Sequence, residues 1–268
     1  MGAYKHLLVG CNDGVETIVL NRPERRNALS PELITELALA LDAAEAGPCG
    51  VVVLTGAGPA FCSGLDLTQL EAFDVADPDK SRNDAENLAR VLRALYDFPK
   101  PVIAAVNGPA IAGGMSLATL PDITLATPDA RLGMNEVRVG FVPAIEAAFL
   151  RRQVGEKRTR ELLLSGRLLR AQEAMAMGLV SQIVPHEELL PTAYALAHSL
   201  LRNSPQAMQQ VKELMIEHAH RTLDEEIEAA IEVNARQQSS DDFREGVEAF
   251  LLHRRADWPS LRALMTIN

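Results

Sequence analysis

Two short glycine-bearing stretches carry the strongest chemical signal in this chain. The first runs from Gly56 to Leu67 and the second from Asn107 to Leu117, and each lies between a strand-like apolar run and a helix-like run. Glycine lets a backbone pass close to a ligand, and the first turn of a helix has N–H groups without intrahelical partners. Two such turns facing each other would donate hydrogen bonds to a carbonyl oxygen that becomes negative during a reaction. The spacing therefore predicts an oxyanion hole built from backbone.

The composition indicates a globular chain and disfavours two classes of function. Hydrophobic residues make up 47% of the 268 residues, enough to bury the core of one large domain with a small appendage. The net charge of −10 disfavours a general nucleic-acid binder, although the basic run Arg151–Arg160 could bind a small anion or simply face solvent. No apolar stretch reaches the roughly 20 residues that span a bilayer, and Met1–Val9 lacks a signal-peptide core. We expect a cytoplasmic protein that binds neither nucleic acid nor membrane.

The cysteines give an odd count without the spacing of a metal site: Cys11, Cys49 and Cys62. This pattern predicts a reducing compartment, no disulfide framework and no bound metal. Cys62 lies inside the first glycine stretch, but no histidine is near it in the sequence. We expect its thiol to be a small buried side chain.

Around the glycine stretches the chain alternates strands, turns and helices. Asn12-Asp13-Gly14 is a strong hairpin signal, and Ser30 before Pro31 predicts the start of a helix. The expected strands are Leu7–Val9, Val15–Leu20, Val51–Leu54, Val102–Val106, Asp122–Ala126 and Val180–Val184. The expected helices are Pro31–Glu45, Ala85–Tyr96, one beginning near Gly113 and Ala144–Val154, with Asp74–Asp84 as a mobile loop. This alternation predicts an α/β core with parallel strands at residues 1–195 and a C-terminal helical region for assembly at 196–268.

An ordered series of motifs resembles the crotonase (enoyl-CoA hydratase/isomerase) superfamily. The strongest matches are Ala60–Leu67, Lys100–Gly108, Ala112-Gly113-Gly114, and Glu136-Val137 followed by Gly140–Pro143. The resemblance implies an α/β fold built as a spiral of ββα units, with C-terminal helices that form a homotrimer or homohexamer. It also implies an acyl-CoA thioester as ligand, so that coenzyme A enters as part of the substrate and no separate cofactor is needed.

The same resemblance implies which residues bind the thioester. The amides of Leu65 and Gly113 would form the oxyanion hole, and the dipole of the helix beginning at Gly113 would favour a negative oxygen. The residues expected to contact the acyl-CoA are Ala28, Ser63, Leu65, Asp66, Leu67, Gly113, Ala144, Phe250 and His253. Phe250 and His253 fall where the family supplies an aromatic residue and a lysine from a late helix, often from a neighbouring subunit. Histidine in place of lysine would weaken a phosphate contact at neutral pH.

The catalytic carboxylates are where this chain departs from the well-known hydratases. Hydration of an enoyl thioester needs a base for the water that attacks Cβ and an acid for protonation at Cα. Glu136 matches the later of the two family glutamates, but Ser116 occupies the position of the first. A serine can hold a water but does not act as a base at neutral pH without help.

Three interpretations of the missing glutamate remain open. Glu136 could act as both base and acid, with Ser116 and the Ala144 amide orienting the water. Glu146 could supply the second carboxylate, or could be a favourable acid in the first turn of a helix. Alternatively, the chain could be a Δ3,Δ2-enoyl-CoA isomerase, because moving a double bond needs only one base. The stretch Gly140–Ile145 resembles a hydratase-like subgroup that also tends to lack the first glutamate, so we predict an enoyl-CoA hydratase.

Other classes of function have weaker support. Gly114–Ala118 is close to the nucleophile elbow of serine hydrolases, with alanine in place of the last glycine. Its histidine would have to come from candidates without a supporting motif: His186, His198, His218 or His220. A non-catalytic acyl-CoA-binding protein and an RNA-binding scaffold are compatible with the fold. The acidic net charge disfavours RNA, and the retained Glu136 disfavours a protein without activity.

Overall fold

The chain begins with an antiparallel hairpin formed by β1 (Leu7–Asn12) and β2 (Val15–Leu20). Its two-residue turn, Asp13 and Gly14, has positive φ at both positions, 49° and 78°. Such a turn matches the right-handed twist of the flanking strands, which is why Asp-Gly is so strong a hairpin signal. The predicted hairpin is confirmed. The computed structural model describes residues 4–66, 78–218 and 240–266.

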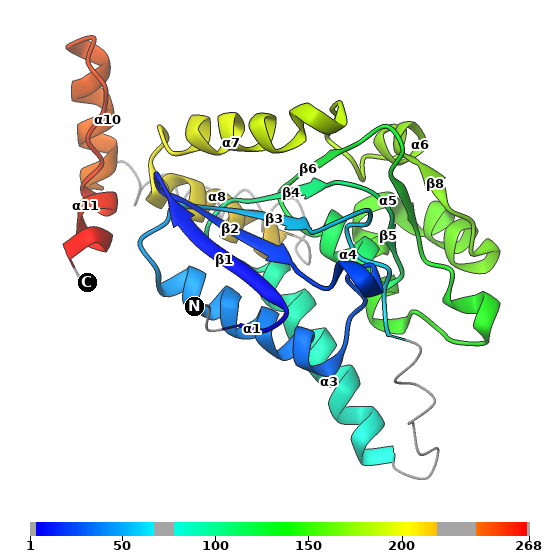
Figure 1. The fold of residues 1–268 in the computed structure, drawn as a ribbon. Helices are drawn as coiled ribbons and strands as arrows, with labels where there is room; N and C mark the ends of the chain where they lie inside the picture. Colours follow the sequence, from blue (N-terminus) through cyan, green and yellow to red (C-terminus); the bar gives the residue numbers. More distant parts are fainter. Residues whose placement is uncertain (1–3, 67–77, 219–239, 267–268) are drawn as a thin grey trace.

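The hairpin forms one edge of a six-stranded sheet with the order β1-β2-β3-β4-β6-β9 (Figure 1). All pairs after the hairpin are parallel, so the predicted α/β core with parallel strands is confirmed. The further strands are β3 (Val51–Gly56), β4 (Val102–Val106), β6 (Ile123–Ala126) and β9 (Gln182–Ile183). Every residue of β3 and β4 is buried, as expected for strands covered on both faces.

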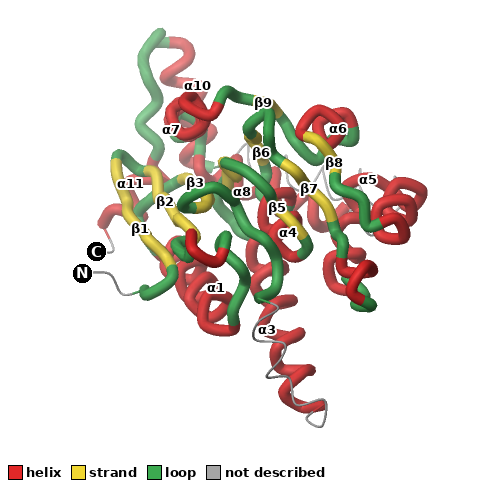
Figure 2. The backbone as a smooth tube through the Cα atoms, turned by 45° about the vertical axis from the view of Figure 1, so that its right-hand side comes forward, coloured by secondary structure: helices red, strands yellow, loops and turns green. Residues whose placement is uncertain are grey.

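A smaller sheet, ordered β5-β7-β8, lies beside the main one (Figure 2). Its strands are β5 (Ala110–Ile111), β7 (Arg131–Gly133) and β8 (Leu169–Arg170). β5 follows β4 after a short turn that contains Gly108, so the second glycine stretch runs from one sheet into the other. This change of sheet carries the chain into the helix that begins at Gly113.

Helices surround the two sheets, and short 3-10 turns connect some of them. The helices are α1 (Pro31–Ala46), α3 (Pro78–Tyr96), α4 (Gly113–Thr119), α5 (Ala144–Ser165), α6 (Ala171–Ala176), α7 (Leu189–Leu200), α8 (Pro205–His218), α10 (Asp241–Leu251) and α11 (Pro259–Thr266). The 3-10 turns are η1 (Pro23–Arg25), η2 (Glu136–Val139) and η3 (His186–Glu188). Ser30 caps α1 as predicted, since its Oγ accepts a hydrogen bond from the Leu33 amide at 3.2 Å.

Two predicted helix boundaries were wrong, and the strands predicted as Leu7–Val9 and Val180–Val184 are Leu7–Asn12 and Gln182–Ile183 in the structure. The segment 78–84, expected to belong to a loop, forms the start of α3, while 74–77 lies outside the described residues. Arg82 and Asn83 are exposed there, and Arg82 forms an ion pair with Glu86 one turn further along the helix. The helix predicted as Ala144–Val154 is α5, which extends to Ser165 because the chain resumes helical geometry after Gly155, whose φ of 77° and ψ of 167° are not helical.

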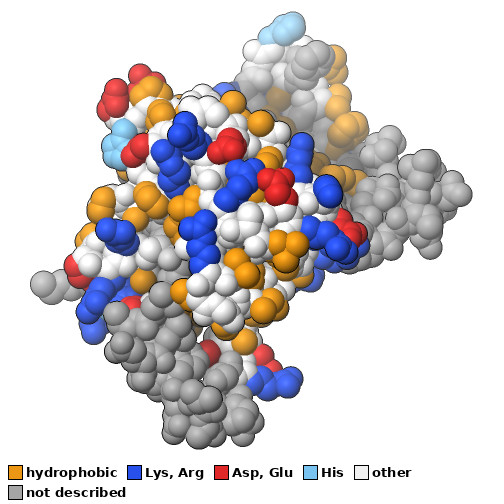
Figure 3. All heavy atoms as spheres, turned by 90° about the vertical axis from the view of Figure 1, so that its right-hand side faces the viewer, with side chains coloured by type: hydrophobic (Ala, Val, Ile, Leu, Met, Phe, Trp, Pro, Cys, Tyr) orange, Lys and Arg blue, Asp and Glu red, His pale blue; other side chains and the backbone are white. Residues whose placement is uncertain are grey.

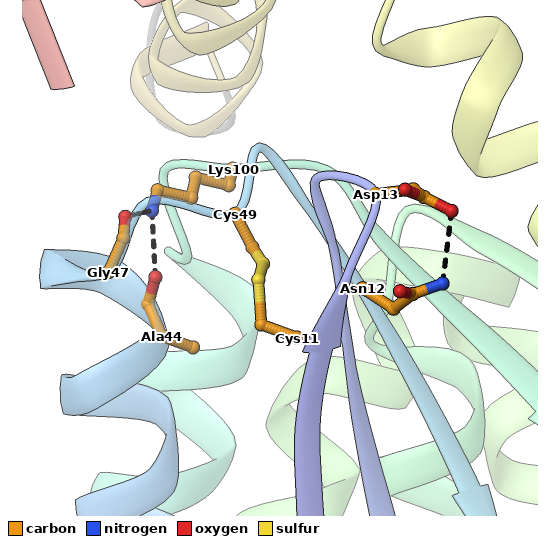
Figure 4. The surroundings of a disulfide bond; sticks show 7 residues. All are labelled: Cys11, Asn12, Asp13, Ala44, Gly47, Cys49 and Lys100. Carbon is orange, nitrogen blue, oxygen red and sulfur yellow. Dashed lines mark hydrogen bonds between the residues drawn. A yellow bond between two sulfur atoms is a disulfide. The ribbon is translucent and has the colours of Figure 1, made fainter. Parts of the chain in front are cut away.

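A disulfide joins Cys11 to Cys49, which contradicts the prediction of no disulfide (Figure 4). Cys11 lies on β1, and Cys49 lies in the turn before β3, 38 residues further along the chain. The pairing of β2 with both β1 and β3 brings their Cα atoms within 6.5 Å, inside the range a disulfide can bridge. Cys62 is free and fully buried, as predicted, and burial raises the pKa of its thiol to about 12.

The C-terminal helices α10 and α11 lie side by side at one end of the molecule, far from α4 and α5 (Figure 1). Asp242 of α10 is buried, and its carboxylate accepts hydrogen bonds from the hydroxyl of Ser260 on α11 and from that of Ser204 before α8. The predicted boundary between residues 195 and 196 falls within α7 and stays a prediction. Among the described residues, no helix is long and apolar enough to cross a membrane.

Candidate active site

The first glycine turn is held by a short parallel bridge between Leu29 and Leu65. The Leu29 amide donates to the Gly64 carbonyl at 2.8 Å, and the Asp66 amide donates to the Leu29 carbonyl at 3.1 Å. Gly64 has a φ of 86°, a conformation that glycine adopts without steric cost. In a trans peptide the N–H points opposite to the preceding carbonyl, so the Leu65 N–H is directed away from Leu29.

The second glycine turn places an unusual backbone conformation directly before a helix. Ala112 has a φ of 54° and a ψ of −131°, and its amide donates to the Gly133 carbonyl at 2.7 Å. Gly113 then begins α4, so its N–H has no intrahelical partner and lies at the positive end of the helix dipole. A positive φ at alanine costs energy and tends to persist only where the surroundings enforce it.

The two turns touch each other at the residues that precede the expected oxyanion amides. A Cβ added to Gly64 would lie 2.6 Å from the Ala112 Cβ, and one added to Gly114 would overlap the Cys62 carbonyl oxygen. The Ile111 amide also donates to the Cys62 carbonyl at 2.9 Å. Both contacts are too close for any side chain, so glycine is required where the turns meet. The amides of Leu65 and Gly113 lie directly beside these contacts.

A buried carboxyl lies beside the second turn. Glu146, in the first turn of α5, is only 4% exposed, and its Oε1 lies 3.6 Å from the position that a Cβ on Gly113 would take. α4 and α5 are tied together further along, where the Gln153 side chain donates to the Thr119 carbonyl at 2.5 Å. Burial raises the pKa of Glu146. A backbone hydrogen bond to the Glu146 carboxyl opposes this rise, and burial outweighs it.

Glu136 is the second buried carboxyl, at the start of η2, and it interacts with Glu146. It is 8% exposed, and its Oε2 has no hydrogen-bond partner among the described residues. Burial raises the pKa of Glu136 to about 7, a backbone hydrogen bond opposes this shift, and the negative charge of Glu146 adds to it. Two like charges in a buried site resist ionising together, so the charge of Glu146 favours the protonated form of Glu136.

Ser116 follows Gly113 by one turn of α4 and is also buried, with 2% exposure. Its Oγ has no hydrogen-bond partner in the described part of the chain. The serine–histidine hydrogen bond of a hydrolase is therefore not formed there, which argues against the nucleophile-elbow interpretation. A buried hydroxyl without a partner is costly unless a water or a ligand meets it.

Three of the remaining predicted residues lie at the first turn. Ala28 and Asp66 are buried there, and the Ser63 amide next to them donates to the Arg26 carbonyl. The Ala144 amide, expected to orient a water, instead donates to the Val142 carbonyl at 2.8 Å. Leu67 lies outside the described residues.

Phe250 and His253 are not brought to this site within one chain. Phe250 lies on α10 and the exposed His253 follows that helix, at the end of the molecule opposite α4 and α5 (Figure 1). A contact from either residue to a ligand at Gly113 would have to come from another copy of the chain.

The sequence prediction missed Arg22, a buried arginine whose Nη2 lies 3.0 Å from Asp66 Oδ2. Arg22 precedes Pro23 in a turn that reads as a simple end of a strand. Arg22 becomes noticeable only through its partner Asp66, which lies 44 residues later in the chain, and no spacing rule links the two positions.

The surface near the carboxyls is mixed in character. Figure 3 views the side of the molecule that carries α5 and α6, where Lys and Arg side chains are scattered among hydrophobic ones. The basic residues of the run Arg151–Arg160 are exposed, and Arg160 pairs with Glu156 at 2.7 Å. Val139 and Phe141 are 66% and 53% exposed. The η2 turn therefore lies at the surface with the carboxyl of Glu136 turned inward.

Known proteins are similar to this chain over nearly its whole length. The family model for enoyl-CoA hydratase/isomerase matches residues 10–261. The chain is 43% identical over 242 residues to a Thermus thermophilus protein named "Putative enoyl-CoA hydratase", covering 90% of this chain and 95% of the relative. It is 34% identical over 254 residues to the 2,3-dehydroadipyl-CoA hydratase of Escherichia coli, covering 94% and 98%. The crystal structure of an enoyl-CoA hydratase from Shewanella pealeana matches the fold with a TM-score of 0.91 at 29% identity, covering 96% of this chain and 97% of that one.

Proposed function

The chain belongs to the enoyl-CoA hydratase/isomerase family, and we propose that within it this protein adds water across the 2,3 double bond of an enoyl-CoA thioester. The family and the fold support an acyl-CoA thioester as the substrate of a crotonase-type site. The observation that carries hydration is the pair of buried carboxyls, Glu136 and Glu146, which interact electrostatically and of which Glu146 lies beside Gly113. Hydration needs a base and an acid together, and a pair that shares one proton supplies both.

In the proposed reaction the thioester oxygen accepts hydrogen bonds from the amides of Leu65 and Gly113. The ionised carboxylate of the pair takes a proton from water as the water oxygen bonds to Cβ. The π electrons move toward the carbonyl and form an enolate, whose negative oxygen the two amides stabilise. The protonated carboxyl then delivers its proton to Cα. One proton has moved from water to the pair and one from the pair to carbon, so the pair ends with the same total charge.

Ser116 fits this scheme as the group that holds the water. Its buried hydroxyl lies on the same helix as the Gly113 amide and lacks a partner among the described residues. Serine cannot replace the first family glutamate as a base, but it can accept or donate one hydrogen bond to a water. We assign the second carboxylate to Glu146, which reaches the site from α5 instead of α4.

Isomerisation of a 3-enoyl-CoA is the second candidate. It is favoured by Ser116, because a site with Glu136 as its single base can move a proton between two carbons. The raised pKa of Glu136, about 7, suits such a role as well. The two reactions differ in whether Glu146 is needed.

The test is to mix the purified protein with crotonyl-CoA and longer 2-enoyl-CoAs and to follow the loss of the conjugated-enoyl absorbance. We expect hydration in the wild type and a fall in kcat of about 10²–10⁴-fold in both Glu136→Gln and Glu146→Gln. Glu187→Gln, at an exposed glutamate of η3, is the matched control and should keep the wild-type rate.

A 3-enoyl-CoA is assayed in parallel. Conversion of this substrate without hydration of any 2-enoyl-CoA, unaffected by Glu146→Gln, would establish the isomerase instead. Binding of acyl-CoA without either conversion would make the chain a non-catalytic acyl-CoA-binding protein. Full hydration by Glu146→Gln would remove that residue from the mechanism and leave Glu136 as the single carboxyl.

A further inference from the structure

Arg22 is a buried cation next to the first glycine turn. The residue is 9% exposed, and its partner Asp66 is 8% exposed. Its guanidinium binds two groups at once: Nη1 donates to the Ala28 carbonyl at 2.5 Å and Nη2 donates to Asp66 Oδ2 at 3.0 Å. Burying a guanidinium is costly unless its hydrogen bonds are satisfied, and a buried ion pair is weak evidence for stability alone. The fork of arginine is suited to holding two acceptors in a fixed relation.

The two acceptors lie on opposite sides of the bridge that holds the Leu65 amide. Ala28 directly precedes Leu29, and Asp66 directly follows Leu65. Between them the Leu29 amide binds the Gly64 carbonyl and the Asp66 amide binds the Leu29 carbonyl. The guanidinium therefore crosslinks both strands of a bridge that consists of one residue pair, Leu29 and Leu65.

The direction of the Leu65 N–H depends on this bridge. The Gly64 carbonyl and the Leu65 N–H belong to one planar peptide and point in opposite directions. Whatever fixes the Gly64 oxygen against Leu29 therefore fixes the Leu65 N–H on the other side. Gly64 itself, with a φ of 86° and no side chain, offers little resistance to rotation of this peptide.

We infer that Arg22 is a positioning residue for the oxyanion hole: by holding the Ala28 carbonyl and the Asp66 carboxylate together, it fixes the Leu65 amide toward the thioester oxygen. The inference rests on the proposed function in that it takes the Leu65 amide as an oxyanion donor. It assigns Asp66 to the ion pair with Arg22, and it has Arg22 act through the Leu65 amide.

The experiment compares Arg22→Gln/Asp66→Asn with the wild type. The double variant removes both charges together and so leaves no buried charge without a partner. The readout is the stretching frequency of the thioester carbonyl, measured by infrared difference spectroscopy with a saturated acyl-CoA that carries a ¹³C label at this carbonyl. Oxyanion-hole donors lower this frequency by polarising the carbonyl. A series of saturated acyl chains supplies a thioester that the wild type binds.

We expect the bound frequency to be lowered in the wild type and to move back toward the free value in the double variant, with kcat about 10- to 100-fold lower and KM changed little. The matched control is Lys212→Gln/Asp122→Asn, which removes the ion pair of 2.6 Å between α8 and the residue before β6. This control should lower the melting temperature without changing the carbonyl frequency. Arg22→Lys, which keeps the charge but loses the fork, replaces the double variant if that protein does not fold.

A folded double variant with the wild-type frequency and kcat would overturn the inference and leave Arg22 a structural residue. The proposed function can fail separately: a wild type that lowers the carbonyl frequency but hydrates no 2-enoyl-CoA would refute hydration while the role of Arg22 stood. A wild type that binds none of the thioesters would overturn both.

Discussion

The two halves of the candidate site are held in place by opposite means. The backbone half, at Gly64 and Ala112, is fixed by hydrogen bonds and by contacts too close for an added methyl group. The carboxyl half, Glu136 and Glu146, is fixed by burial, and Glu136 Oε2 has no partner in the described part of the chain. The backbone half therefore has one geometry and little chemical freedom. The carboxyl half can take up and release a proton near neutral pH, because the pKa of Glu136 is about 7, and acid–base chemistry requires this.

The largest expected effect is that of Gly64→Ala, which adds one methyl group where the turns meet. The new Cβ would lie 2.6 Å from the Ala112 Cβ and 2.9 Å from the Ile111 carbonyl oxygen, so the turns must separate. Because the Leu65 amide moves with them, we expect kcat to fall about 10²–10³-fold, the cost of losing one oxyanion donor. Steady-state kinetics with the preferred 2-enoyl-CoA measures it.

Gly178→Ala is the matched control for Gly64→Ala. Gly178 has a similar φ of 81° but nothing within 4 Å of an added Cβ. It should lose about 1 kcal/mol of stability through backbone strain and keep the wild-type kcat. Equal losses of activity in the two variants would show that strain, rather than the contact between the turns, limits the site.

The second prediction concerns the carboxyl half and uses pH. The pKa of Glu136 in the folded chain is about 7, above that of an unfolded glutamate, so the folded state keeps a proton that the unfolded state releases. Its contribution to stability is complete below the unfolded pKa and is lost as the pH rises through 7. The free energy of unfolding of the wild type should therefore fall relative to that of Glu136→Gln by about 1–3 kcal/mol between pH 4 and 8, allowing for solvent screening. Chemical denaturation of both proteins at several pH values measures the difference.

The same experiment in a Glu146→Gln background tests the interaction between the two carboxyls. Removing the negative charge of Glu146 lowers the pKa of Glu136 in the folded chain, so the loss of stability should be complete at a lower pH and be smaller. A difference between wild type and Glu136→Gln that does not vary with pH would mean that Glu136 ionises normally, and the shared proton would be lost from the mechanism.

The two halves also differed in how well the sequence predicted them. The backbone half depends on glycines and on helix starts, which are local features, so the turns at Gly64 and Gly113 could be located from motifs. The hairpin at Asp13 and the cap at Ser30 were predictable for the same reason. Local chemistry determines such elements, whatever the rest of the chain does.

The carboxyl half depends on contacts that no local pattern encodes. Glu146 reads equally well as a helix-stabilising acid, and only its burial beside Gly113 and its effect on Glu136 distinguish the two roles. The Arg22–Asp66 pair and the Cys11–Cys49 disulfide were missed for a related reason. Each joins positions brought together by long-range pairing: the β1, β2 and β3 strands for the disulfide, and the Leu29–Leu65 bridge for the ion pair.

The smallest expected effect is that of Ala112→Gly, which tests whether the strained residue of the second turn contributes to function. Glycine adopts a φ of 54° with a ψ of −131° more readily than alanine does, so the substitution relieves strain in the folded state. It also frees the unfolded chain, which costs about 0.4–1 kcal/mol. The two terms oppose each other, and we expect the free energy of unfolding to change by less than about 1 kcal/mol.

The activity of Ala112→Gly should nevertheless fall several-fold. Alanine at this position limits the orientations of the following peptide, and the Gly113 amide loses that restriction when the methyl group is removed. Differential scanning calorimetry and kcat, measured on the same preparation, separate the two effects. An unchanged kcat would mean that the hydrogen bond from the Ala112 amide to the Gly133 carbonyl and the start of α4 are sufficient to aim Gly113. Hydrogen bonds from outside the second turn would then fix it, which is the same kind of support that we propose Arg22 gives to the first turn.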